Sequence, residues 1–124
     1  MQFLMLVKHG EIPGAPPKEF IEAMKKMGED ATKSGTMIAS GGLVPISKST
    51  RVRLSRGQVT AMDGPYTEAR EVVGGFAMFD LKSEEEAIEG ATRFMELHKK
   101  YWPGWEGETE VRQVLGPEAF EPKA

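Results

Sequence analysis

The sequence predicts an α+β fold in which two helices cover one face of an antiparallel sheet. Gln2 to Lys8 and Phe76 to Leu81 are short apolar runs, and we expect both to be strands, the first buried on both faces. Each run is followed by a segment with helical periodicity and then by a further strand-like segment. Two such interleaved units give a ferredoxin-like sandwich, with the two apolar strands as its central pair.

The first helix is expected to begin at Pro16-Pro17, because N–H groups in the first helical turn are unpaired and proline costs nothing there. Gly35 is expected to end it as a left-handed cap. A second strand follows over Thr36 to Val44, and its glycine pair Gly41-Gly42 favours a bulge. The apolar positions at helical spacing are Phe20, Met24, Met27 and Ala31.

A hairpin is inserted before the second central strand. Arg51 to Leu54 alternates polar and apolar side chains, as a half-buried strand does. Arg56-Gly57 then turns the chain into a partner strand over Gln58 to Met62.

The second helix is expected to begin at Ser83, since Ser with Glu86 three residues later forms a capping box. Pro103-Gly104 ends it, and Thr109 to Leu115 is the last strand. We therefore predict one domain over residues 1–116 and a loose or swapped C-terminal tail over residues 117–124.

Composition narrows the class of protein. A net charge of −3 argues against a nucleic-acid binder with a broad basic face. With no cysteine there is no disulfide framework, thiol nucleophile or thiolate metal site, which fits a reducing cytoplasm. The apolar N-terminus is too short to span a membrane and lacks the features of a signal peptide. We expect a cytoplasmic protein that binds neither nucleic acid nor membrane, and we predict no cofactor and no metal site.

The sheet face opposite the helices would carry Phe and Met side chains and needs a cover. A second subunit is the economical cover, so we expect a symmetric homodimer.

The most informative stretch runs from Val59 to Phe79. Asp63 before Gly64-Pro65 favours a turn, because its carboxylate can accept nearby backbone N–H bonds. Thr67 can then cap a short helical turn over Glu68 to Glu71. The segment is either a structural corner or a polar site on a loop held by a rigid strand.

The segment "DGPYTEAREVVGGFAMFDLKSEEEAIEGA" resembles the signature of the DGPF branch of the YCII-related proteins, with Tyr66 in place of Phe and Arg70 in place of Lys. The likeness continues to about Leu115. The resemblance implies a ferredoxin-like fold that dimerises and is related to dimeric α/β-barrel enzymes, with a largely unassigned biochemical role. Some relatives have been proposed to use a His–Asp pair. The first helix here has no histidine, so His9 with Asp63 is the nearest substitute.

The candidate catalytic residues are Asp63 and His9. Asp63 would orient or exchange a proton, and His9 would serve as a general base near neutral pH. The alternative for His9 is a strand-end histidine bonded to a carbonyl, and for His98 a helix-end histidine packed beside Trp102. Nearby aromatics would pack a core or an interface, or alternatively line a pocket. The candidate substrate-binding residues, which would tune Asp63 or hold a carboxylate, are Tyr66, Glu68, Arg70, Glu71, Arg51 and Arg53.

Two functions remain open on the sequence. The first is a homodimer that binds a small organic acid or lactone in a cleft near the DGP turn, with cofactor-free acid/base chemistry by fold-level analogy. The second is a non-catalytic dimer that serves a protein partner, since DGPF-type proteins are often associated with bacterial sigma factors.

Overall fold

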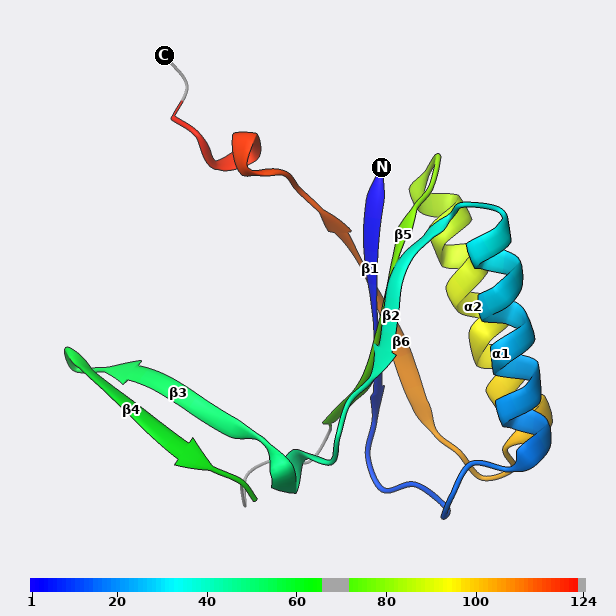
Figure 1. Ribbon diagram of the computed structural model, residues 1–124, viewed down its shortest axis with the longest axis horizontal. Helices are drawn as coiled ribbons and strands as arrows, with labels where there is room; N and C mark the ends of the chain where they lie inside the picture. The colour runs from blue at the N-terminus through cyan, green and yellow to red at the C-terminus, as the bar shows by residue number, and fades with distance from the viewer. Residues whose placement is uncertain (66–71, 123–124) are drawn as a thin grey trace.

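The fold is built on one antiparallel sheet (Figure 1), and the computed structural model describes residues 1–65 and 72–122. Within these residues the sheet has the strand order β2-β5-β1-β6, and a separate hairpin pairs β3 with β4. The elements are β1 (Gln2–His9), α1 (Lys18–Lys33), β2 (Met37–Gly42), η1 (Ile46–Lys48), β3 (Thr50–Ser55), β4 (Gln58–Asp63), β5 (Val72–Asp80), α2 (Glu84–Tyr101), β6 (Gly107–Val114) and η2 (Pro117–Phe120).

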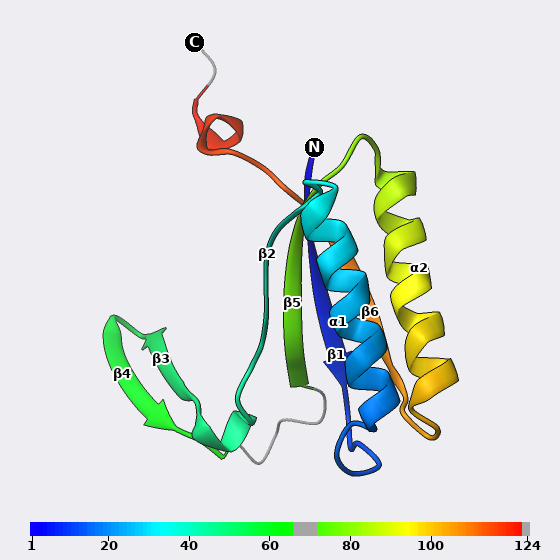
Figure 2. The same cartoon turned by 45° about the vertical axis from the view of Figure 1, so that its right-hand side comes forward.

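The topology confirms the predicted ferredoxin-like arrangement. The units β1-α1-β2 and β5-α2-β6 interleave, so β1 and β5 are the central pair and every neighbouring pair in the sheet is antiparallel. Both helices lie against the same face of the sheet (Figure 2). The other face carries no helix of the described chain, and we call it the open face.

The core lies between the helices and the sheet. Phe3 and Met5 of β1 pack against Ala87 and Ala91 of α2. A second buried cluster at the far end of the helices joins Phe20 of α1 to Leu97 and Trp102. Burying such side chains stabilises the fold by about 1.5–3 kcal/mol for each large one.

The helix boundaries follow the predicted caps. Gly35 has φ +76°, the left-handed conformation expected of a helix-ending glycine. The Ser83 side chain accepts a hydrogen bond of 3.2 Å from the Glu86 N–H. The Glu86 carboxylate reaches one residue further back than a capping box requires and accepts from the Lys82 N–H at 3.1 Å.

Three details differ from the expectation. Within the described chain β1 is buried on its helix face only, and Leu4 and Leu6 on the open face are half-buried. The irregularity in β2 lies between Met37 and Ala39 and not at Gly41-Gly42; Gly41 instead lies close to the Phe76 ring, where a Cβ would come within 3.1 Å. β5 begins at Val72, four residues before the predicted strand. The helical turn predicted after Thr67 lies outside the described residues.

The inserted hairpin projects from the sheet, and we call residues 50–63 the arm. Arg56 and Gly57 have φ 52° and 77°, which is the two-residue turn that suits the twist of a hairpin. The arm leaves the sheet on the side away from the helices, and the segment after β6 leaves on the same side (Figures 1 and 2). None of the helices in the described part of the chain has the length and apolar character needed to cross a bilayer.

Candidate functional site

Asp63 lies at the base of the arm, exposed to solvent. Its carboxylate accepts a hydrogen bond of 2.7 Å from the Thr50 hydroxyl across the hairpin. The following Gly64 N–H donates to the Ser49 carbonyl at 2.9 Å. The described part of the DGP turn therefore closes the arm, as a structural corner would, while leaving the Asp63 carboxylate accessible.

The two arginines of the arm lie on its other face. Arg51 is opposite Met62 and Arg53 is opposite Thr60, whereas Asp63 is opposite Thr50. Cross-strand partners share a face and neighbours alternate, so the arm separates the arginines from the Asp63 carboxylate. The other candidate substrate-binding residues, Tyr66, Glu68, Arg70 and Glu71, lie outside the described residues.

His9 lies at the end of β1 on the helix side of the sheet. Its Nδ1 donates to the Gly10 carbonyl at 2.8 Å, and its ring lies 6.4 Å from the Trp105 ring. This is the strand-end histidine bonded to a carbonyl that the sequence left as the alternative. The pairing of His9 with Asp63 stays a prediction.

Gly74 makes room for His9. The register of β1 against β5 slips between Val7 and Lys8, so Gly74 is skipped. A Cβ on Gly74 would overlap the imidazole of His9. The sequence indicated a bulge at Gly74-Gly75 but gave no sign that it seats a histidine, because that contact joins residues 65 positions apart.

His98 is the most deeply buried polar side chain of the described chain, with 4% of its surface exposed. Its ring lies 4.6 Å from the Phe20 ring, 4.7 Å from that of Phe94 and 4.2 Å from that of Trp105. It is also nearly parallel to Trp102, at 6.4 Å and 11°, which confirms the predicted packing beside that residue. Both histidines of the chain therefore contact Trp105.

The protonation state of His98 follows from this environment. Its Nδ1 lies 2.8 Å from the Phe94 carbonyl oxygen, and because a carbonyl can only accept, Nδ1 carries the proton. Burial lowers the pKa of His98 from its ordinary value, and the bond to Phe94 opposes this more weakly. The imidazole is therefore neutral at neutral pH, with its lone pair on Nε2.

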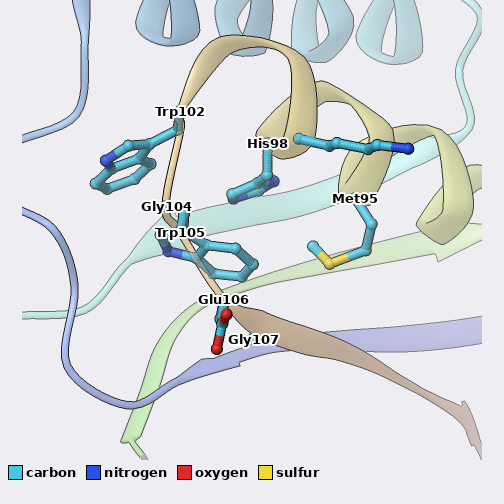
Figure 3. A pocket seen from close by; sticks show the side chains of 8 residues that line it. Met95, His98, Trp102, Gly104, Trp105, Glu106 and Gly107 are labelled. Atoms are coloured by element: carbon cyan, nitrogen blue, oxygen red, sulfur yellow. The ribbon is translucent and has the colours of Figure 1, made fainter.

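A hollow of about 380 Å³ opens beside this imidazole (Figure 3). The Trp105 ring can lie close to the backbone of Gly107, because a side chain at that position would collide with the ring. From the sequence, the aromatic residues near the end of this helix were expected to pack a core or an interface, and a pocket wall was the alternative. The usable signal was Pro103-Gly104, which ends α2 and lets the chain bring Trp105 back over His98. The hollow is lined by Met95, His98, Lys99, Trp102, Gly104, Trp105, Glu106 and Gly107.

Charged groups also lie on the open face. Lys8 of β1 forms an ion pair with Glu110 of β6, and Arg112 lies 3.5 Å from the same carboxylate. The hydrogen bond from Lys8 lowers the pKa of Glu110, and the charges of Lys8 and Arg112 act in the same direction. Among the described residues, no three His, Cys, Asp or Glu side chains lie together as a metal site would require.

The family model of the YCII-related domain matches residues 1–97, most of the chain. The chain belongs to the YCII-related family. It is also similar to an uncharacterised protein of Rhizobium meliloti (strain 1021), with 39% identity over 49 residues. That alignment spans 40% of this chain and 40% of the relative. In this YCII-related protein the family match ends one residue before His98. His98, Trp102 and Trp105, which line the hollow, therefore lie beyond the matched residues.

The contact between Gly74 and His9 predicts that substitutions at these two positions have coupled effects on stability. Gly74→Ala should lower the free energy of unfolding by about 1–3 kcal/mol, because the new methyl overlaps the imidazole. In a His9→Ala background the same change should cost much less, as a double-mutant cycle in urea would measure. Gly42→Ala is the matched control, since a Cβ there meets no atom within 4 Å. An equal cost of Gly74→Ala with and without the His9 ring would contradict the contact.

The neutral, buried His98 predicts a pH dependence of stability. The unfolded chain binds this proton more readily than the folded chain, so the contribution is full above pH of about 6.5 and is lost as the pH falls toward the lower folded-state pKa. Urea unfolding between pH of about 7.5 and about 5 should show a smaller loss for His98→Phe than for the wild type. Identical pH profiles for wild type and His98→Phe would refute this account.

Proposed function

We propose that this YCII-related protein, as a member of the DGPF branch, works as a cytoplasmic homodimer that binds a small organic acid or lactone beside the base of the arm. The observation that carries the proposal is the apolar strip along the open face. Leu4 and Leu6 of β1 are paired with Met78 and Phe76 of β5. Since Phe3 and Met5 face the helices, these four side chains point the other way. They are half-buried in the single chain.

The arm supports the same conclusion. Val52 and Leu54 alternate with the arginines on β3, and Val59 opposite Leu54 shares their face. These three side chains are 71%, 72% and 69% exposed. An isolated two-stranded hairpin is marginally stable in water, so an arm with an uncovered apolar face calls for a packing partner.

The segment after β6, which includes Leu115 and the tail, adds a third apolar surface. Leu115 and Phe120 are 54% and 79% exposed, and the tail leaves the sheet on the same side as the arm (Figure 1). A second copy related by a two-fold axis would cover the open face and give each arm and tail an identical partner surface. The open strip, the arm and the tail then belong to one continuous interface.

The ligand site in this proposal is the base of the arm. Arg51 and Arg53 would hold a carboxylate, since guanidinium groups bind carboxylates in a bidentate way. Asp63 would orient the ligand or exchange a proton with it, in cofactor-free acid/base chemistry, with His9 as a second candidate base. What supports this arrangement is that Asp63 is accessible and fixed by Thr50, and that Arg51 and Arg53 belong to the same hairpin, although on its other face. One arm alone leaves this site open to solvent. In the dimer, residues of the partner copy would enclose the ligand from the other side.

The second function is a non-catalytic dimer whose arm serves another protein in transcription regulation. The projecting apolar arm face favours it as much as it favours a second copy. The oligomeric state of the purified protein distinguishes these two roles of the arm. If the dimer dissociates when the arm is altered, the arm serves self-association.

The dimer predicts a mass of twice the 13.7 kDa chain in light scattering coupled to size exclusion. Leu54→Lys should shift the protein toward the monomer and raise the dimer dissociation constant by at least about tenfold, because it places a charge in the apolar contact. Thr60→Lys, the same change of charge on the other face of the arm, should leave the dimer intact. A wild-type monomer, or equal effects of the two variants, would oppose the proposal.

The ligand site predicts selective thermal stabilisation. In a screen of small monocarboxylic acids and lactones, a ligand present at about 100 times its dissociation constant stabilises the fold by about 2.7 kcal/mol, which thermal melting detects. Asp63→Ala and Arg53→Gln should reduce the shift, and Arg56→Gln at the hairpin turn should retain it. No stabilising compound, or equal shifts in Asp63→Ala and wild type, would count against this site while leaving the dimer untouched.

A further inference from the structure

The hollow at the end of α2 lies on the helix side of the sheet, away from the arm and the open face. Its lining residues come from the last turns of α2, the following loop and the first residue of β6. None of these lining residues belongs to the open face, the arm or the acid site proposed above, although Trp105 also contacts His9. In Figure 3 the imidazole of His98 and the indole of Trp105 lie over one another, with the Met95 side chain beside them.

The polar group of this hollow is the His98 imidazole. It is 96% buried, and within the described residues its one hydrogen bond runs from Nδ1 to the Phe94 carbonyl. Nε2 is left as an acceptor with no partner in that part of the chain. The buried side-chain polar atom without a partner in the described residues is Thr109 Oγ1 and not Nε2 of His98, so Nε2 is reached from the hollow, where a ligand donor can replace water as its partner.

The aromatic walls of the hollow determine the shape of the ligand that fits. Trp102 and Trp105 lie 6.4 Å apart with their planes at 37°, and Phe20 and Phe94 support the imidazole from behind. Aromatic surfaces of this kind favour a flat aromatic partner by offset or edge contacts. A volume of about 380 Å³ suits a compound of one or two rings.

The rim carries one charge of each sign. Lys99 and Glu106 both line the hollow and both are solvent-exposed, so the rim gives no net preference for an anion or a cation. A charged ligand would also lose its hydration against the two tryptophans without a buried counter-charge. The selection is therefore for a neutral molecule.

We propose that the hollow around His98, Trp102 and Trp105 is a binding site for a neutral planar aromatic compound with a hydroxyl donor, that is, a phenol. The ring packs against the indoles and Met95, and the hydroxyl donates to Nε2 of His98. The bond from Nδ1 to the Phe94 carbonyl holds the imidazole in the tautomer that accepts this hydrogen bond.

The test uses three probes: phenol, anisole, which keeps the ring and loses the donor, and cyclohexanol, which keeps the donor and loses the ring. The chain has two tryptophans and both line the hollow, so intrinsic fluorescence excited beyond the phenol absorption band reports binding directly. Phenol should give a saturable change, and anisole and cyclohexanol should bind roughly tenfold more weakly, the equivalent of one hydrogen bond or one aromatic contact.

Two further measurements assign the effect to His98. With nitrogen-15 labelled histidine, phenol should shift the Nε2 resonance of His98 more than that of His9, the assignment being made with His9→Gln. In His98→Phe, which keeps an aromatic ring and removes the acceptor, phenol and anisole should bind equally, while Lys100→Gln, at an exposed residue outside the hollow, should keep the wild-type preference. Equal affinities for phenol and anisole in the wild type, no saturable change with phenol, or an unmoved His98 Nε2 would each overturn the proposal.

Discussion

The pairing of β1 with β5 is the contact on which the other parts of the fold depend. It sets Phe3 and Met5 against α2 and directs Leu4 and Leu6 to the open face, so one register decides what each side of the sheet presents. A shift of one residue would exchange the two faces and expose the core. The same pairing skips Gly74 and thereby seats His9. The core, the open face and the environment of a histidine are therefore consequences of one alignment of two strands.

The molecule has two chemically different regions as a result. On the helix side, aromatic rings gather around His98, and this burial lowers its pKa and keeps the imidazole neutral. On the other side, the open face, the arm and the tail place apolar side chains in contact with solvent. The first region has the features of a ligand site, since it joins a buried imidazole to an open hollow. The second has those of an interface, because exposed apolar surface of this extent is uncommon in a monomer.

The sequence predicted the fold well because its signals are local. Ser83 caps α2, Gly35 ends α1, and Arg56-Gly57 turns the arm, and each depends on a few neighbouring residues. The site was less accessible to sequence reasoning. Nothing local shows that Gly74 lies against His9 or that Trp105 lies over His98, since those contacts follow from the order of the strands. Asp63 was singled out for its turn chemistry, but its partner Thr50 and its separation from Arg53 depend on the register of the hairpin.

Covering of the open face by a second copy is the central claim, and hydroxyl-radical footprinting tests it most directly through three methionines. Met5 faces the helices and is 6% exposed, Met24 on α1 is 39% exposed, and Met78 lies on the open face opposite Leu4. At concentrations that favour association, Met78 should be oxidised as slowly as Met5, and dilution should raise its rate toward that of Met24. A Met78 rate that stays near that of Met24 at every concentration would show that the open face is not covered by a second copy.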